Sequence, residues 1–138
     1  MAAELVTETK EDYLRAICRL QEKTMAKVGT VQLAEHLMLA KSTVSERLKE
    51  LKDQGLIKHD RYAAIELTPR GQKVAKRIEY NHRLIEVFLH DTLRLSKEKI
   101  HDEAHKLEHA FSDESIEKLR RFLRYPKYCP HGQPLKKP

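Results

Sequence analysis

The sequence predicts a mainly α-helical protein with one short β-hairpin near its middle. Apolar residues recur at helical spacing over most of the chain, residues that start or end helices separate these stretches, and two strand-like runs flank a bend at residues 60–62. Of the 138 residues, 40% are hydrophobic and 35% are charged, which is typical of a folded chain with a polar surface. We expect two small domains, residues 1–72 and residues 73–138, with a Pro-rich tail from about residue 125.

The first part of the chain predicts three helices. Residues 8–22 form an amphipathic helix, after which Thr30 can cap a short helix that ends at Leu37. Ser42 can cap the next helix, which runs to Gln54 and stops at Gly55. A short helix, a tight turn and a second helix make a helix-turn-helix. Its predicted inward residues are Val31, Ala34, Leu37, Val44, Leu48 and Leu51.

A β-hairpin follows directly, because Leu56–His59 and Ala64–Leu67 are short strand-like runs. A helix-turn-helix followed by such a hairpin is a winged helix-turn-helix, whose second helix enters the major groove of DNA while the wing contacts sugar and phosphate. From Lys41 to Arg77, ten Lys or Arg residues stand against five Asp or Glu residues, which favours a polyanionic partner. The residues expected to contact DNA are Lys41, Ser42, Thr43, Ser45, Glu46, Arg47, Arg61 and Tyr62. A winged helix used for protein contacts is the alternative.

The second part of the chain predicts further helices. Thr68 and Pro69 start a long helix that runs toward Leu93, and Ser96 opens the next one. Ser112 or Asp113 opens a last helix, whose inward residues are Ile116, Leu119 and Leu123.

Histidines and acids gather on two of these helices. His101, His105, Glu108 and His109 fall within an arc of about 100° beside an apolar stripe. His82 and Glu86 are four residues apart on the long helix, so they form a second half-site. Imidazole and carboxylate together suit first-row divalent metals, so we interpret these residues as metal ligands, with a solvated helical face as the alternative.

The order of these elements resembles a known family. STVSERLKEL, TPRG, HRLIE, HDEAHKLEH and CPHGQP together are similar to the diphtheria-toxin-repressor family of metal-dependent transcriptional regulators of iron and manganese uptake. The resemblance implies an N-terminal DNA-binding domain and an α-helical metal-binding and dimerisation domain, in the form without an SH3-like third domain. It further implies a homodimer on double-stranded operator DNA, most simply a repressor. The effector would be Fe²⁺ or Mn²⁺, with Zn²⁺, Co²⁺ or Ni²⁺ able to bind in vitro.

Carried over by residue, the resemblance implies one site made of Asp12, His105, Glu108 and His109, and a neighbouring site made of His82, Glu86 and His101. Asp12 rests on the resemblance alone. His105 stands where the iron-responsive branch has Cys and the manganese-responsive branch has Glu, and Arg15 stands where the manganese-responsive branch has a second acid. We interpret Cys129 and His131 as a linker motif, with no thiolate among the ligands, and Cys18 as a core residue.

Other classes of protein fit the sequence less well. No apolar run approaches the ~20 residues of a membrane span, and the polar N-terminus is unlike a signal peptide, so we expect a cytoplasmic protein with no membrane partner. His105, Glu108 and His109 match the H-x-x-E-H pattern of zinc metallopeptidases. That reading leaves the winged helix without a function, so we expect no enzyme and no small-molecule substrate. A metal-independent winged-helix regulator is the other alternative.

Overall fold

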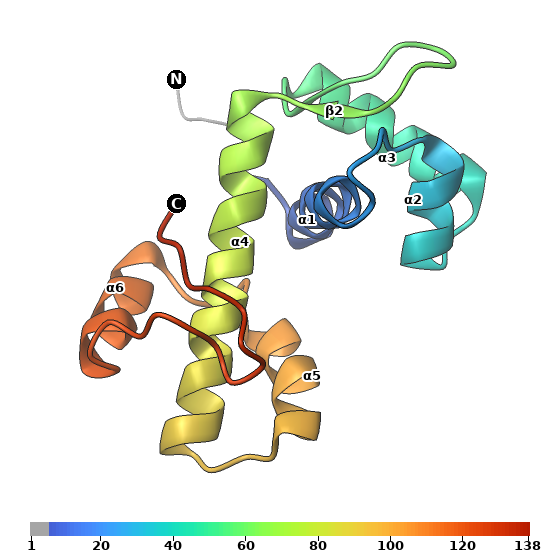
Figure 1. The fold of residues 1–138 in the computed structure, drawn as a ribbon. Helices are drawn as coiled ribbons and strands as arrows, with labels where there is room; N and C mark the ends of the chain where they lie inside the picture. Colours follow the sequence, from blue (N-terminus) through green and yellow to red (C-terminus); the bar gives the residue numbers. More distant parts are fainter. Residues whose placement is uncertain (1–5) are drawn as a thin grey trace. The chain divides into compact units, whose positions relative to one another are not determined.

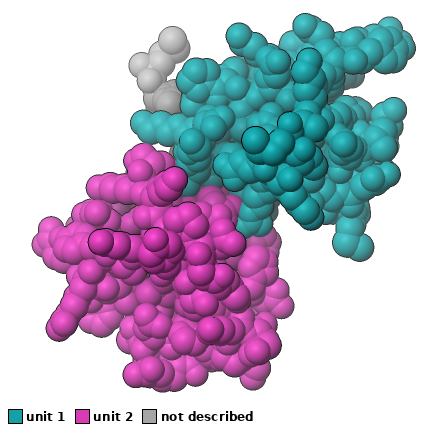
Figure 2. Space-filling model, in the orientation of Figure 1, with its two compact units in different colours: residues 1–76 teal, residues 77–138 magenta. Residues whose placement is uncertain are grey.

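The computed structural model describes residues 6–138, which form two compact units (Figures 1 and 2). Unit 1 ends at Lys76 and unit 2 comprises Arg77–Pro138. Unit 1 contains α1 (Glu8–Thr24), α2 (Thr30–Leu37), α3 (Lys41–Asp53), β1 (Ile57–Lys58), β2 (Glu66–Leu67) and the first turns of α4 (Pro69–Val87). Unit 2 contains the rest of α4, the π-helical segment η1 (Phe88–Thr92), α5 (Lys97–Leu107), α6 (Asp113–Phe122) and the tail.

The core of unit 1 confirms most of the predicted helical stripes. Its buried apolar residues come from α1, α2, α3, the wing and the start of α4. The exception is α2, where Val31 is 51% exposed and Leu33 is fully buried, so the inward position predicted for Val31 is wrong. On a helix of eight residues, two faces are about equally apolar in the sequence. Packing against α1 and α3 buries the face that contains Leu33.

Two of the predicted helix starts differ from the observed ones by one or two residues. Gly29, and not Thr30, is the N-cap of α2, and its backbone N–H donates to the side chain of Gln32 at 3.0 Å. Ala40, and not Ser42, is the N-cap of α3 and makes no side-chain capping bond. Thr68 does cap α4, because its hydroxyl oxygen accepts from the backbone N–H of Gly71 at 3.1 Å.

The wing is a two-stranded antiparallel hairpin in which Ile57 pairs with Leu67 and Lys58 pairs with Glu66. An isolated bridge adds Val28 to it, because the backbone N–H of Ile65 donates to the Val28 carbonyl at 2.8 Å. The hairpin confirms the predicted strand pair, with shorter strands than expected.

Gly71 fixes where α4 begins relative to the wing. A Cβ atom on Gly71 would lie 2.0 Å from the carbonyl oxygen of Leu56, so no side chain fits between the first turn of α4 and the residue before β1. Only glycine permits this close approach of two backbones.

Unit 2 packs the lower part of α4 against α5 and α6 around a second apolar core (Figure 1). The helix predicted to run toward Leu93 ends at Val87 and continues as η1. Ser112 caps α6, since its hydroxyl accepts from the backbone N–H of Ser115 at 3.0 Å. None of the helices in residues 6–138 is both long enough and apolar enough to cross a bilayer.

The Pro-rich tail folds back onto unit 2. Tyr128 and Pro134 form a β-bridge, and Leu135 packs against the core of the unit. Arg83 of α4 donates to the carbonyl oxygen of Pro134 at 2.9 Å. The tail is therefore held by backbone pairing, apolar packing and side chains of α4.

Candidate functional site

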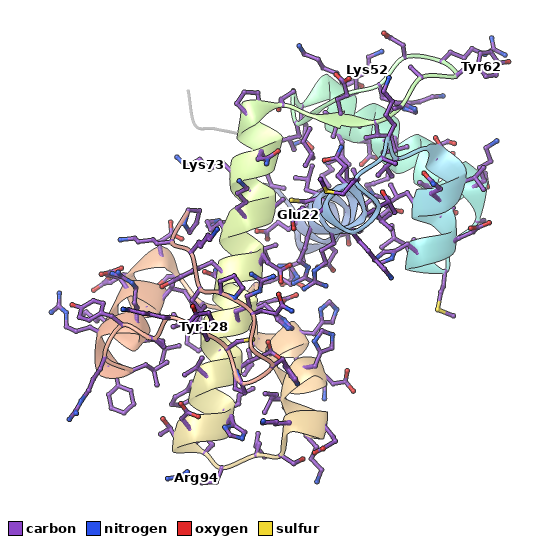
Figure 3. The ribbon with its side chains drawn as sticks, viewed as in Figure 1. Glu22, Lys52, Tyr62, Lys73, Arg94 and Tyr128 are labelled. Carbon is purple, nitrogen blue, oxygen red and sulfur yellow. The ribbon has the colours of Figure 1, made fainter. Side chains whose placement is uncertain are left out.

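A basic hollow lies on unit 1 between α3, the start of α2 and the wing. Its volume is about 840 Å³. Figure 3 labels Lys52 on α3 and Tyr62 at the tip of the wing, which both line this hollow. Its other charged or polar lining residues include Lys41, Ser45, Lys49, His59, Asp60 and Arg61. Four cations against one carboxylate favour the polyphosphate backbone of a nucleic acid.

The residues predicted to contact DNA do not share one environment. Lys41, Ser42, Thr43 and Glu46 are exposed on α3, whereas Ser45 and Arg47 are half-buried. On the wing, Tyr62 is 93% exposed and the guanidinium carbon of Arg61 lies 5.1 Å from the centre of its ring. Tyr62 also has a positive φ of 64°, which turns the chain at the tip of the hairpin. Sequence reasoning did not include Lys49, Lys52 and His59. Lys49 and Lys52 follow Lys41 and Ser45 along one face of α3, a spacing that the sequence contains, whereas His59 reaches the hollow through the position of the wing.

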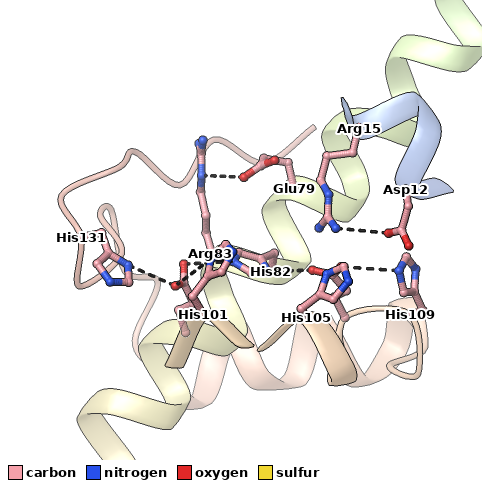
Figure 4. A network of polar contacts seen from close by, with 11 residues as sticks. Asp12, Arg15, Glu79, His82, Arg83, His101, His105, His109 and His131 are labelled. Carbon is pink, nitrogen blue, oxygen red and sulfur yellow. Dashed lines mark hydrogen bonds and ion pairs between the residues drawn. The ribbon is translucent and has the colours of Figure 1, made fainter. Parts of the chain in front are cut away.

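In unit 2, α4 and α5 bring His82, Glu86 and His101 together. Figure 4 labels the two histidines. Nε2 of His82 lies 3.1 Å from Nδ1 of His101 and 3.5 Å from Oε1 of Glu86. His82 and Glu86 are buried, at 2% and 3% exposed, whereas the His101 side chain is 57% exposed. The cluster therefore has a buried floor on α4 and an open side at α5.

Two further potential metal ligands, Cys129 and His131 of the tail, lie close to the same carboxylate. Nδ1 of His131 lies 3.1 Å from Oε2 of Glu86, and the thiol of Cys129 completes a group whose donor atoms are all within 4.8 Å of one another. Cys129 is buried and its thiol is free of any disulfide. The thiolate that sequence reasoning set aside is thus a candidate ligand. The spacing of one Cys and one His two residues apart in a Pro-rich segment was the only signal for it.

The hydrogen bonds around His131 indicate that a proton or a metal ion lies between it and Glu86. Nε2 of His131 lies 3.2 Å from the carbonyl oxygen of Lys97, which can only accept, so Nε2 carries the hydrogen. In the neutral imidazole, Nδ1 is then an acceptor, and it faces Oε2 of Glu86, a buried oxygen that makes no hydrogen bond of acceptable geometry. Two acceptors 3.1 Å apart require a proton or a metal ion between them.

The spacing and chemistry of these donors fit a first-row divalent metal. Two donor atoms that lie about 2.2 Å from one ion and at right angles to each other are about 3.1 Å apart. The His82–His101 and Glu86–His131 contacts both have this length. Nitrogen, carboxylate oxygen and thiolate sulfur together suit Fe²⁺, Co²⁺ and Zn²⁺, and the nitrogen and oxygen donors alone also suit Mn²⁺.

Glu108 links this cluster to a second one at the end of α5. Its Oε2 lies 2.7 Å from Nδ1 of His82. An ionised carboxylate only accepts, so Nδ1 of His82 donates and the lone pair on Nε2 faces His101. The other oxygen of Glu108, Oε1, lies 2.9 Å from Nδ1 of His105 and 3.4 Å from Nε2 of His109. One buried carboxylate therefore orients a ligand of the first cluster and belongs to the second.

The helix that carries the second cluster is shorter than predicted. Because α5 ends at Leu107, Glu108 is its C-cap and His109 lies in the following turn. The single helical face expected for His101, His105 and His109 therefore does not extend to His109. The turn still brings the His105 and His109 rings to a centroid separation of 6.4 Å.

Asp12, the ligand taken from the resemblance, lies on α1 in unit 1. Its Oδ1 accepts from Nη2 of Arg15 at 3.2 Å, one helical turn further on (Figure 4). The Arg15 side chain is 6% exposed, so this pair is better shielded from solvent than a surface ion pair.

A winged helix-turn-helix joined to a helical unit with clustered His, Glu and Cys donors defines a class of metal-responsive DNA-binding regulators. Comparison with known proteins is more specific. Residues 5–65 match the N-terminal DNA-binding domain of iron-dependent repressors, and residues 68–136 match their metal-binding and dimerisation domain. The chain therefore belongs to the iron-dependent repressor family, which is a family of transcriptional regulators.

Individual relatives agree with this family. The chain is 35% identical over 118 residues to an uncharacterised HTH-type transcriptional regulator of Methanocaldococcus jannaschii, a match that covers 86% of this chain and 94% of that protein. It is 32% identical over 130 residues to the diphtheria toxin repressor of Corynebacterium diphtheriae, which covers 94% of this chain and 57% of the repressor.

A solved structure shows the same fold. A manganese-dependent transcriptional repressor in complex with manganese superimposes with a TM-score of 0.84 at 38% identity, over 92% of this chain and 58% of that one. The chain thus spans little more than half the length of this structure and of the diphtheria toxin repressor.

Proposed function

We propose that the protein is a metal-dependent transcriptional regulator that binds operator DNA as a homodimer and is activated by Fe²⁺ or Mn²⁺. We further propose that it represses genes of metal-ion uptake or homeostasis, acts in the cytoplasm and is not an enzyme. The observation that carries the proposal is the cluster around Glu86, where three imidazoles and a thiol lie close to one buried carboxylate. We propose Fe²⁺ or Mn²⁺ because of the family to which the chain belongs. The ligand atoms alone would also bind Zn²⁺, Co²⁺ and Ni²⁺.

The ligands fall into two proposed sets. His82, Glu86 and His101 form one, which Cys129 and His131 extend through Glu86. His105, Glu108 and His109 form the other, and we propose that Asp12 completes it from α1. A bound divalent ion supplies the positive charge that holds these carboxylates and imidazoles together.

DNA binding is assigned to unit 1. We propose that Lys41, Ser42, Thr43, Ser45 and Glu46 of α3 face the major groove and that Arg61 and Tyr62 of the wing contact the sugar-phosphate backbone. Lys49 and Lys52 extend the basic lining of the same hollow. Residues 1–72 would then form the DNA-binding domain and residues 73–138 the domain for metal binding and dimerisation.

Asp12 gives the proposal its link between metal and DNA. A carboxylate on α1 that joins His105, Glu108 and His109 favours one arrangement of the DNA-binding domain over others. The metal can shift the equilibrium between the arrangement that binds DNA and the one that does not only if its affinity for the two arrangements differs. Linkage then requires operator DNA to raise the affinity for metal by the same factor, typically about 5- to 150-fold.

The test is selection of genomic DNA fragments by the purified protein under anaerobic conditions, with chelator, Mn²⁺, Fe²⁺ or Zn²⁺ at one fixed salt concentration. We expect one metal to enrich a palindromic site that is not enriched with chelator. His101→Gln should abolish this enrichment, whereas the matched control His90→Gln should keep it, because His90 pairs with Asp91 outside both ligand sets.

Enrichment that is equal with metal and with chelator would refute metal activation and support a metal-independent winged-helix regulator. The absence of any enriched sequence under all four conditions would refute operator binding itself.

A further inference from the structure

Arg47 points toward α1 and not into the basic hollow. Its Nη1 lies 2.8 Å from Oε2 of Glu50, and its guanidinium carbon lies 6.0 Å from the centre of the Tyr13 ring. The side chain is only 32% exposed. Of the α3 residues, those that line the hollow are Lys41, Ser45, Leu48, Lys49 and Lys52, which follow one helical face, and Arg47 is not among them.

Glu50 is shared between cations of two helices. Its Oε2 accepts from Arg47, one turn earlier on α3, and also lies 3.7 Å from Nζ of Lys10 on α1. The Lys10 side chain is only 12% exposed, so its ammonium is held near the protein surface and not extended into solvent. One carboxylate oxygen therefore joins α1 to α3.

Tyr13 provides the second contact between these helices. Its ring is 3% exposed within the core of unit 1. Burial raises the pKa of the Tyr13 phenol, and the neighbouring Arg47 guanidinium opposes this rise. The Arg47 guanidinium thus lies over the ring of a residue that the core holds in place.

We propose that Arg47 is a positioning residue that ties the recognition helix α3 to α1 through Tyr13 and through the Glu50–Lys10 pair, and that it does not contact DNA. We call Lys10, Tyr13, Arg47 and Glu50 the α1–α3 network. The proposal rests on the proposed function, since it concerns how the DNA-reading helix of that function is oriented.

The network has a regulatory consequence. Tyr13 directly follows Asp12, the carboxylate through which we propose that metal binding acts on unit 1. A change in the position of this part of α1 therefore reaches α3 through side chains that contact each other. Loss of the network should weaken the effect of metal on DNA binding without removing a phosphate contact.

The experiment measures DNA affinity of the full chain against salt concentration, with saturating Mn²⁺. The probes are the genomic fragment most enriched by the wild type and a duplex of mixed sequence. The variants are Arg47→Gln and Glu50→Gln. Lys41→Gln is the control for loss of a phosphate contact, and Glu35→Gln, on the exposed side of α2, is the control for loss of one negative charge.

Lys41→Gln should reduce the slope of log affinity against log salt by about 0.9, the value for one phosphate contact. Arg47→Gln should leave this slope unchanged and weaken binding to the enriched fragment about three- to tenfold. Glu50→Gln should weaken binding to a similar extent, although removal of an acid by itself favours DNA binding. Glu35→Gln should not weaken it.

Two results would overturn the proposal. One is a slope that falls in Arg47→Gln as it does in Lys41→Gln. The other is a Glu50→Gln variant that binds DNA as tightly as the wild type or more tightly.

A second readout requires neither DNA nor metal. In urea unfolding with chelator, the double variant Arg47→Gln/Glu50→Gln should shift the midpoint by less than the sum of the two single shifts, because both changes break the same contacts. Strictly additive shifts would contradict the network even if metal-dependent DNA selection succeeds. Coupled shifts would support the network even if that selection fails.

Discussion

Replacement of Glu86 by Gln should change metal binding and the stability of the metal-free protein in opposite directions. Glu86 is 3% exposed, and its Oε2 makes no hydrogen bond of acceptable geometry. An unsatisfied buried polar atom costs about 1–3 kcal/mol, and a charged one costs more. Gln has the same shape without the charge, and its amide N–H can donate to Nδ1 of His131, which lies 3.1 Å from Oε2 in the wild type.

We therefore expect Glu86→Gln to raise the free energy of unfolding with chelator by about 1 kcal/mol. That gain corresponds to an increase in Tm of about 3–5 °C for a chain of this size. The same change removes the carboxylate that the His82–His101 pair and the Cys129–His131 pair share, so we expect metal affinity to fall at least about 100-fold. At fixed excess metal, a loss of this size removes about 2.7 kcal/mol of metal-induced stabilisation.

The assay is urea unfolding followed by circular dichroism, with chelator and with excess Mn²⁺, for the wild type, Glu86→Gln and the control His90→Gln. The control should behave as the wild type does under both conditions. If Glu86→Gln instead lowers the midpoint with chelator and keeps the metal-induced shift, Glu86 is a structural ion-pair residue and the reasoning is wrong.

Three further changes test other parts of the structure. Co²⁺ bound to the wild type should show a thiolate-to-cobalt charge-transfer absorption that Cys129→Ser lacks; an identical spectrum in the variant would remove Cys129 from the ligands. Leu135→Ala should loosen the tail that carries Cys129 and His131 and weaken metal binding about tenfold in competition with a chromophoric chelator, whereas Lys136→Ala at the neighbouring exposed position should not. Gly71→Ala should lower the free energy of unfolding by about 2 kcal/mol, because its Cβ would lie 2.0 Å from the Leu56 carbonyl oxygen and this overlap outweighs the better helix propensity of Ala. An unchanged or higher urea midpoint in this variant would show that the backbone can yield there at little cost.

Local signals located most of the helices. Gly55 has a φ of +72° after α3, Thr68 and Pro69 open α4, and Ser112 caps α6, as their residue types predict. Each of these signals acts within a few residues of its own position, which is why the sequence alone reveals it. The caps of α2 and α3 were misplaced by one or two residues, because the direction of the chain before a short helix depends on what the helix packs against.

Some of the proposed metal ligands could likewise be predicted from local spacing, and others could not. His82 with Glu86, and His101 with His105, are four residues apart on helices, so their shared faces follow from helical geometry. Cys129 and His131 reach Glu86 only because the tail folds back, held by Leu135 in the core and by Arg83 at the Pro134 carbonyl. These contacts join residues more than forty positions apart, and no local pattern encodes them.

The sequence by itself determined the winged helix-turn-helix, the helical ligand pairs and, through the order of its motifs, the family. Only the tertiary structure decided that Arg47 faces α1 and that the tail adds a thiol and an imidazole to the Glu86 cluster. The physical reason is that helical periodicity places residues on a face, whereas packing between separate elements decides what each face meets.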